Sequence, residues 1–201
     1  MSSVIINYIN NIESYSYLEL GIFDNKNFNQ IKCNHKYSVD INGNALFTGT
    51  TDEYFSQLNS NIVFDIIYID ANHDLEYVVR DFNNSISHAR RWILIHDMIP
   101  PTQEHTQSKF CSDSYKLLYY LMTETNNLVY PLDNDFGMTA IKIPASKVIN
   151  TKIDTELSYS KFIKFITKQK IYTNKELIKL FNQENNIHRA LFHDPFILGI
   201  K

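Results

Sequence analysis

The stretch VFDIIYIDANHDLEYVVRD, residues 63–81, decides the fold class. Residues 63–69 are short, rich in β-branched side chains and nearly all apolar, which predicts a buried strand that ends at Asp70. Residues 73–89 then carry apolar side chains at helical spacing, namely Leu75, Val78, Val79, Phe82 and Ile86. A second buried strand, residues 92–95, ends at His96 and Asp97. Strand, helix and strand in this order predict a parallel pair joined by a right-handed crossover.

The same alternation extends in both directions from this unit. Further strands are predicted at residues 17–20, 37–41, 45–47, 128–132 and 138–143. Further helices are predicted at residues 5–12, 25–31, 51–58, 115–122, 158–168 and 174–186, with Thr51 as the N-cap of the third of these. This order indicates an α/β protein with a mostly parallel sheet and helices on both faces.

Composition excludes several classes of protein. With 201 residues, 44% of them hydrophobic and 20% charged, the chain is expected to form one globular domain with some additions. Its longest apolar runs are far shorter than the ~20 residues that span a bilayer, and no signal peptide is expected. Net charge is −3 and the 19 basic residues are spread along the chain, which argues against a nucleic-acid partner. Cys33 and Cys111 form no disulfide pattern, so we expect a cytoplasmic protein.

Polar residues follow nearly every predicted strand. In parallel sheets ligands bind beyond the carboxyl ends of the strands, so these positions are the candidate site. They are Glu19–Gly21, Asp40, Thr50–Asp52, Asp70–His73 and His96–Asp97. Gly21 permits a tight turn close to a ligand, and Asp40 offers a carboxylate for two hydrogen bonds from a ribose diol. Ordinary turn and cap roles are the alternative for both residues.

The ends of the two buried strands suggest metal and acid–base chemistry. Asp70, Asp97 and one nitrogen of His96 would surround a divalent cation at the sheet edge. The histidine favours manganese or another transition metal over magnesium. His73 would face the same crevice, and an imidazole suits a proton acceptor near neutral pH. A packed or surface histidine is the alternative at each position.

Four stretches of the chain follow the motif order of one enzyme family. They are LELGIFDNKN (residues 18–27), YSVDI (37–41), FDIIYIDANHDLEYVVRD (64–81) with ILIHDMIPP (93–101), and DNDFGMTAIKI (133–143). Together they resemble class I S-adenosylmethionine-dependent methyltransferases. The closest likeness is to the small O-methyltransferases that act on sugars, macrolides and related natural products. The likeness covers residues 15–145, and its third stretch is the most specific.

The resemblance implies a Rossmann-like, seven-stranded sheet in the order 3-2-1-4-5-7-6, with the last strand antiparallel. Residues 1–145 would form the cofactor-binding domain, and residues 146–201 a helical extension packed on it. S-adenosylmethionine is the implied cofactor, with magnesium or manganese as an option. The implied cofactor contacts are Glu19, Leu20, Gly21 and Asn25 at the methionine turn, Asp40 and Ile41 at the ribose, Thr50, Thr51 and Asp52 at the adenine, and Asp70. Asp70, His96 and Asp97 match the metal positions of metal-dependent relatives, and His73 matches the base of catechol-type relatives.

Three departures from the family pattern stand out. Asn25 replaces the second glycine of the methionine turn, and asparagine tolerates positive φ better than most residues. Arg90 and Arg91 replace a Gly-Gly pair before the fifth strand, on the side away from the crevice. His96 stands where a carboxylate is usual, which puts metal dependence in question.

The expected function is methylation of a hydroxyl on a small molecule or sugar, with His73, Asp70 and Asp97 as catalytic residues. Residues 100–112 and the C-terminal helices are expected to form the acceptor pocket. An inactive methyltransferase-like binding module is the main alternative. A nicotinamide-dependent oxidoreductase is disfavoured because it needs G-x-G-x-x-G, and a nucleic-acid methyltransferase needs an N/D-P-P-Y-type run that residues 70–73 lack. Assembly into a homo-oligomer stays open.

Overall fold

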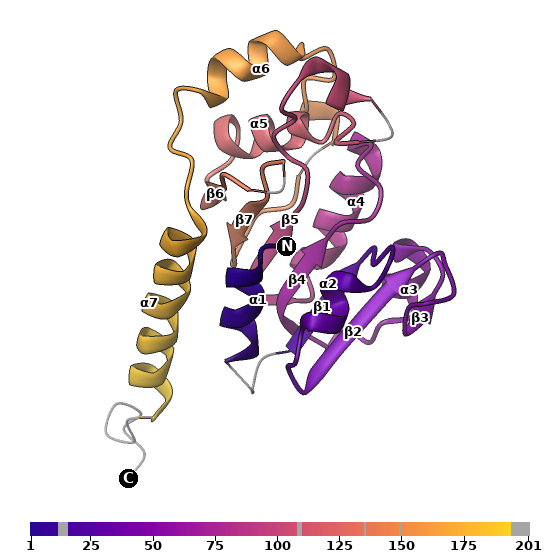
Figure 1. Cartoon of the computed structure of the whole chain (residues 1–201), viewed down its shortest axis with the longest axis vertical. Helices are drawn as coiled ribbons and strands as arrows, with labels where there is room; N and C mark the ends of the chain where they lie inside the picture. Colours follow the sequence, from indigo (N-terminus) through magenta and orange to yellow (C-terminus); the bar gives the residue numbers. More distant parts are fainter. Residues whose placement is uncertain (12–15, 108–109, 135, 149, 194–201) are drawn as a thin grey trace.

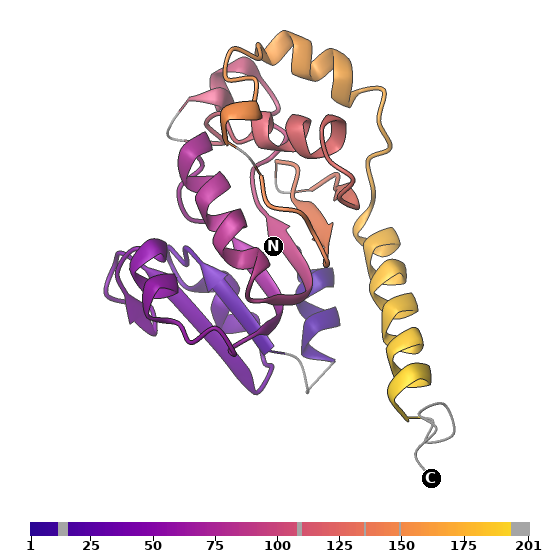
Figure 2. The same ribbon diagram turned by 180° about the vertical axis from the view of Figure 1, so that it is seen from behind.

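A computed structural model of the chain describes residues 1–11, 16–107, 110–134, 136–148 and 150–193. Its centre is one seven-stranded sheet in the order β3-β2-β1-β4-β5-β7-β6, so the expected order is confirmed (Figures 1 and 2). Neighbours from β3 to β5 are parallel, whereas β7 is antiparallel to both β5 and β6. The strands are β1 (Ser16–Leu20), β2 (His35–Asp40), β3 (Phe47–Thr48), β4 (Phe64–Ile69), β5 (Ala89–Ile95), β6 (Val129–Pro131) and β7 (Thr139–Lys142).

Helices cover both faces of the sheet. Side chains of α4, α5 and α6 pack with Leu18, Ile67 and Ile93 on one face. Side chains of α1, α2 and α7 pack with Tyr17, Ile66 and Leu94 on the other. The helices are α1 (Ser3–Asn10), α2 (Lys26–Gln30), α3 (Thr51–Gln57), α4 (Leu75–Ile86), α5 (Tyr115–Thr123), α6 (Tyr159–Ile166) and α7 (Asn174–His193), with the 3₁₀ helices η1 (Gln103–Thr106) and η2 (Asn150–Lys152).

The central strands differ in length from the sequence expectation. Every residue of β4 is buried, as the apolar run predicts. Strand β5 begins at Ala89, three residues earlier than expected, although it opens with two charged residues. Arg90 and Arg91 are accommodated because Asp65 of β4 lies 3.3 Å and 3.1 Å from their guanidinium nitrogens. These ion pairs lie at the start of β5, and its other end forms the site described below.

The C-terminal segment belongs to the same packed body. Phe162 and Ile166 of α6 join the core on one face of the sheet, and Leu177 and Phe181 of α7 join the core on the other. Helix α7 runs beside α1 (Figures 1 and 2). The division at residue 145 stays a prediction, and Ile12 and residues 194–201 of the expected elements lie outside the described residues. No helix among those described is long and apolar enough to cross a membrane.

Candidate functional site

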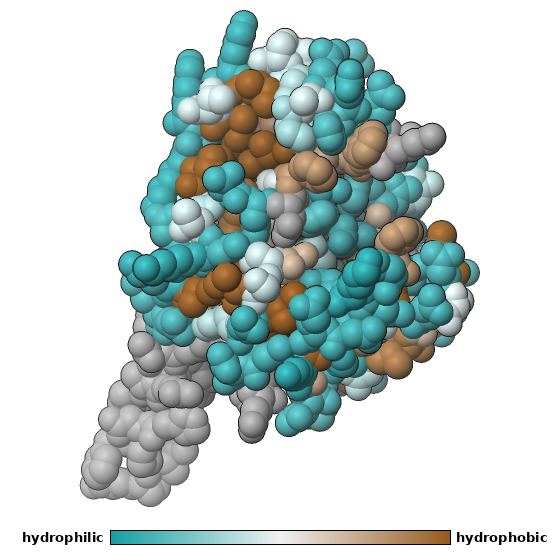
Figure 3. Space-filling model, viewed as in Figure 1, coloured by the Kyte–Doolittle hydropathy of each residue, from teal (hydrophilic) through white to brown (hydrophobic). Residues whose placement is uncertain are grey.

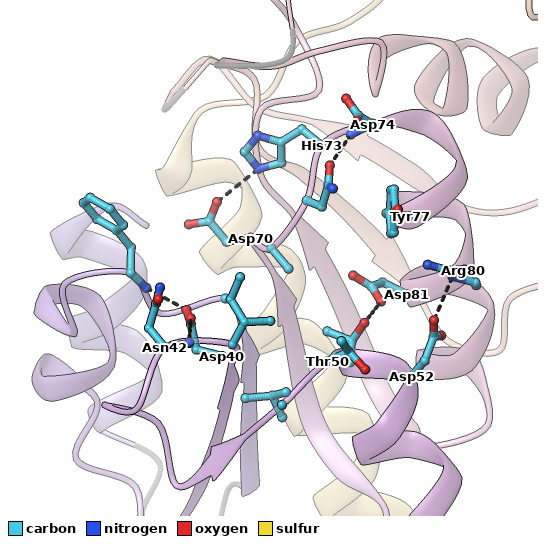
Figure 4. A pocket seen from close by; sticks show the side chains of 18 of the residues that line it. Asp40, Asn42, Thr50, Asp52, Asp70, His73, Asp74, Tyr77, Arg80 and Asp81 are labelled. Atoms are coloured by element: carbon cyan, nitrogen blue, oxygen red, sulfur yellow. Dashed lines mark hydrogen bonds and ion pairs between the residues drawn. The ribbon is translucent and has the colours of Figure 1, made fainter.

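A cavity of about 560 Å³ opens beyond the carboxyl ends of β1, β2 and β4 (Figure 4). Most of the expected cofactor contacts line it: Gly21, Asp40, Ile41, Thr50, Thr51, Asp52 and Asp70. His73 also lines it, together with residues that carried no expected role, including Tyr77, Arg80, Asp81 and Phe110. The structure therefore gathers side chains from four strand ends and two helices around one hollow.

The turn after β1 depends on backbone conformations that few residues adopt. Gly21 has φ +83°, and a Cβ there would overlap the backbone of Asp70 and Ala71. The Gly21 N–H donates to the Val39 carbonyl at 2.8 Å, which ties the turn to β2. Asn25 has φ +62° and is the N-cap of α2, so the expected left-handed asparagine is present. The Asn25 side chain donates to the Asn44 carbonyl and does not line the cavity.

The carboxylate of Asp40, at the end of β2, already accepts three hydrogen bonds from backbone N–H groups. Its Oδ2 accepts from the N–H groups of Ile22 (2.8 Å) and Phe23 (3.1 Å), and its Oδ1 accepts from Asn42 N–H at 2.8 Å. A carboxylate has about four acceptor positions, so about one is left for a ligand. The structure thus leaves room for one ribose hydrogen bond at Asp40, where the sequence suggested two.

Glu19 and Leu20 do not line the cavity. Because side chains alternate along a strand, Glu19 lies on the same face as Tyr17, and Leu20 is fully buried in the opposite core. The Glu19 carboxylate accepts from Tyr17 Oη at 2.8 Å and from Asn27 Nδ2 at 3.0 Å. Burial raises the pKa of Glu19 to about 7. Leu20 contributes its carbonyl, which accepts from Asp70 N–H at 2.8 Å.

The far wall of the cavity is built by α3 and α4. Thr50, and not Thr51 as expected, is the N-cap of α3, and it forms a capping box with Glu53. Thr51 donates instead to Asp81 Oδ1 on α4 at 2.5 Å, and Asp52 pairs with Arg80 at 3.1 Å (Figure 4). Burial raises the pKa of Asp81 to about 7. Asp81 was missed, although an acidic residue beside Val78 and Phe82 on the apolar face of a helix is itself a signal.

Four side chains converge at the ends of β4 and β5. His73 Nε2 lies 3.3 Å from Asp70 Oδ1, and His73 Nδ1 lies 3.2 Å from Asp97 Oδ2. His96 Nδ1 lies 3.2 Å from Asp70 Oδ1 and 3.0 Å from Asp97 Oδ1. We call Asp70, His73, His96 and Asp97 the Asp–His cluster. The predicted convergence of the two strand ends is therefore present.

Three groups that the sequence did not suggest support this cluster. The Phe110 carbonyl lies 2.8 Å from His73 Nδ1, so that nitrogen carries a proton. Tyr68 Oη donates to Asp70 Oδ2 at 3.3 Å. Asp97 has φ +56°, an unusual conformation for a residue other than glycine, and Ser114 Oγ donates to its carbonyl at 2.7 Å. Every residue has a backbone carbonyl, so the residue type does not predict which carbonyl will accept a hydrogen bond, and the contact of Phe110 could not be foreseen.

Charges within the Asp–His cluster stabilise one another. Burial disfavours protonation of His96, but Asp70 and Asp97 outweigh it and raise the His96 pKa to about 10. The same balance raises the pKa of His73, mainly through Asp70 and Asp97. Burial would raise the pKa of Asp70, but His73 and His96 hold it well below its usual range. Without a metal, the cluster therefore pairs carboxylates with imidazolium groups.

The Asp–His cluster also fits a divalent cation. One donor atom from each of the four residues lies within 4.8 Å of the others. His96 Nδ1 and Asp97 Oδ1 are buried and 3.0 Å apart, but among the described residues they make no hydrogen bond of good geometry. Buried polar atoms normally make such bonds, and a cation between these two atoms would give each of them a partner. Oxygen and imidazole donors together suit manganese better than magnesium.

Comparisons with known proteins support the fold. A scan against family models and a search among curated proteins both give no significant match. An O-methyltransferase from Bacillus cereus in complex with S-adenosylhomocysteine matches with TM-score 0.50 and 12% identity, over 71% of this chain and 82% of its own. The chain has the class I methyltransferase fold.

Two further solved structures agree with this fold. Cofactor-bound Rv0187 from MTB matches with TM-score 0.55 and 12% identity, over 73% of this chain and 82% of its own. The O-methyltransferase TomG from Streptomyces achromogenes, in complex with S-adenosylmethionine, matches with TM-score 0.50 and 8% identity, over 71% and 78%. At these identities the methyltransferase fold is shown, and the sugar and macrolide branch stays a prediction.

Proposed function

We propose that this chain transfers a methyl group from S-adenosylmethionine to a hydroxyl oxygen of a small molecule. One observation carries the proposal. Asp70 and His73, which belong to a cluster of two carboxylates and two imidazoles, line a 560 Å³ cavity at the strand ends of a methyltransferase fold. Reactive side chains placed beside a cofactor-sized cavity are the usual arrangement of an active site.

The first cavity offers suitable groups for the cofactor, which would supply the methyl group as a reactive sulfonium. Gly21 leaves room for close backbone approach, and Asp40 retains about one acceptor position for a ribose hydroxyl. Thr50 and Asp52 stand at the opposite wall, where adenine would lie. The protein would contribute alignment and electrostatics.

His73 is the proposed proton acceptor. Its Nδ1–H is fixed by the Phe110 carbonyl, so Nε2 is the nitrogen that would take the proton from the acceptor hydroxyl. Asp70, 3.3 Å from Nε2, would stabilise the imidazolium that results. The raised pKa of His73 means that the neutral form dominates only at higher pH, so methyl transfer should increase as pH rises through that pKa.

Asp70, His96 and Asp97 would hold a divalent cation. Such an ion would supply Lewis acidity, which lowers the pKa of a bound hydroxyl. Bound metal requires neutral imidazole, so its affinity should fall with decreasing pH as His96 becomes protonated.

The test compares His73→Ala with the matched control His35→Ala, which removes an exposed histidine at the start of β2. Methyl transfer from labelled S-adenosylmethionine to 4-methylcatechol is measured with Mg²⁺ and with Mn²⁺, and cofactor binding by calorimetry. We expect His73→Ala to lose about 10²-fold or more in kcat with cofactor affinity retained, and His35→Ala to match wild type.

Two outcomes would contradict this assignment. Near wild-type turnover by His73→Ala would remove His73 as the base. Cofactor binding by the wild type without methyl transfer under either metal would favour the alternative, an inactive methyltransferase-like binding module.

A further inference from the structure

A second cavity, of about 780 Å³, reaches the Asp–His cluster at His96. Three segments enclose it: the chain after β5, the turn between β6 and β7, and α6 of the C-terminal segment. In Figure 3 hydrophobic side chains gather below α6, in the upper part of the molecule. The C-terminal segment therefore supplies one wall of a hollow that reaches the reactive residues.

His96 connects the two cavities. It lines the second cavity, and its Nδ1 lies 3.2 Å from the carboxylate of Asp70, which lines the first. The Asp–His cluster therefore lies where the two cavities adjoin. A methyl donor in the first cavity and an acceptor in the second would have to meet at this edge, with the acceptor oxygen, the methyl carbon and the sulfur in line.

The lining of the second cavity is mainly apolar. Its large side chains are Ile99, Leu132, Phe136, Ile163, Ile166 and Ile171. Among the described lining residues none is lysine or arginine, and Asp133 supplies a negative charge. The imidazolium of His96 also lines the cavity, but it is already paired with the carboxylates of Asp70 and Asp97. An anionic group in this cavity would therefore be desolvated without a free cationic partner.

Asn134 adds one specific polar feature. Its Nδ2 donates to Asn174 Oδ1 at 2.7 Å, which fixes the orientation of the amide. Its Oδ1 is buried and has no hydrogen-bond partner among the described residues, although Asn134 lines the cavity. That oxygen has almost no surface open to the cavity, so the fixed Asn134 amide shapes the wall without offering a ligand a hydrogen bond.

We infer that the second cavity binds the methyl acceptor, and that this acceptor is a neutral or cationic, largely apolar molecule whose hydroxyl reaches past His96 toward His73. Acceptors that carry phosphate, carboxylate or coenzyme A are excluded by the charge of the lining. This inference rests on the proposed function, because it assigns the acceptor side of the same site.

The test uses three catechols that differ in one substituent: 4-methylcatechol (neutral), dopamine (cationic) and 3,4-dihydroxybenzoate (anionic). Each is titrated into protein saturated with S-adenosylhomocysteine and free of added metal, with binding followed by calorimetry or NMR. We expect the neutral and cationic probes to bind about tenfold or more tightly than the anion, a difference of about 1.4 kcal/mol.

A variant pair locates the binding. Ile163→Arg places a cation in the cavity wall, whereas Ser160→Arg adds the same charge at an exposed position of α6. Ile163→Arg should weaken 4-methylcatechol and strengthen 3,4-dihydroxybenzoate by about tenfold, and Ser160→Arg should change neither. Cofactor-product affinity should be unchanged in both variants.

The outcomes separate the two proposals. Equal affinity of wild type for neutral and anionic probes, no saturable binding of any probe, or no response to Ile163→Arg would overturn the acceptor inference and leave the proposed function standing. Failure of the wild-type protein to bind S-adenosylhomocysteine would overturn the proposed function itself.

Discussion

Asp81 is a buried carboxyl at the wall of the cofactor cavity, and its pKa of about 7 couples folding to pH. In the unfolded chain an aspartate releases its proton near pH 4. Between about pH 4 and 7 only the folded state holds this proton, so the free energy of unfolding falls as pH rises.

Asp81→Asn should remove that dependence and retain an acceptor for the Thr51 hydroxyl. At pH 8 we expect the variant to be more stable than wild type, by about 4 kcal/mol at most, and the difference should vanish toward pH 4. Urea unfolding at pH 4.5, 6 and 8 measures it. Glu19 has a similar pKa, and it contributes the same pH dependence of stability to wild type and to the variant, so it cancels in the comparison. A stability difference that does not vary with pH would contradict the assignment.

Individual site residues differ in how far the sequence predicts them. Asp70, His73, His96 and Asp97 could be foreseen to converge, because parallel strands end at one edge of the sheet. The contacts of Phe110 and Asp40 could not be foreseen. Phe110 acts through its backbone carbonyl, which lies beside His73, and Asp40 accepts hydrogen bonds from backbone N–H groups of the neighbouring turn. Glu19 does not line the first cavity, because the motif gives its position along the strand and not the face it occupies, and its contact with the cofactor stays a prediction.

Among the elements, α7 offers a direct test of packing. Phe181 is buried, and its ring centroid lies 4.7 Å from Trp92 of β5 and 5.2 Å from Tyr8 of α1. Phe181→Ala should destabilise the protein by about 3–5 kcal/mol through lost contacts and a cavity. Trp92 is the only tryptophan, so its fluorescence reports this contact.

We expect the Trp92 emission to shift to longer wavelength in Phe181→Ala and to stay unchanged in Lys179→Ala, which alters an exposed residue of the same helix. Identical emission and stability in the two variants would mean that α7 does not pack on β5 in solution.

The predicted bounds of an element agree with the structure where they depend on local sequence alone, and they differ where contacts between distant residues extend the element. The apolar run of β4 and the helical periodicity of α4 predict these two elements from local sequence alone. The early start of β5 at Ala89 depends on Asp65, 24 positions earlier in the chain, which pairs with Arg90 and Arg91. The sequence pattern of the third strand is weak, and the strand that forms is short: β3 covers Phe47–Thr48, whereas residues 45–47 were predicted.

At the scale of the whole molecule, cofactor binding should stabilise the fold by mass action. S-adenosylhomocysteine at 100 times its Kd should add about 2.7 kcal/mol, which raises Tm by roughly 5–10 °C for a chain of this size. NAD serves as the matched control, because the turn after β1 lacks a G-x-G-x-x-G sequence, and it should leave Tm unchanged. Thermal unfolding followed by circular dichroism measures both. A shift with NAD alone would favour the oxidoreductase alternative.

The edge at which the two cavities adjoin bears on how such a protein diversifies. Asp70 lines the first cavity and pairs with His96 of the second, so a change there would alter both cavities at once. The outer walls, α6 and the turn between β6 and β7, line the second cavity and not the first. Under the donor and acceptor roles proposed above, lineages descended from a common ancestor could therefore explore new acceptors through these peripheral segments while inheriting the methyl-donor half intact.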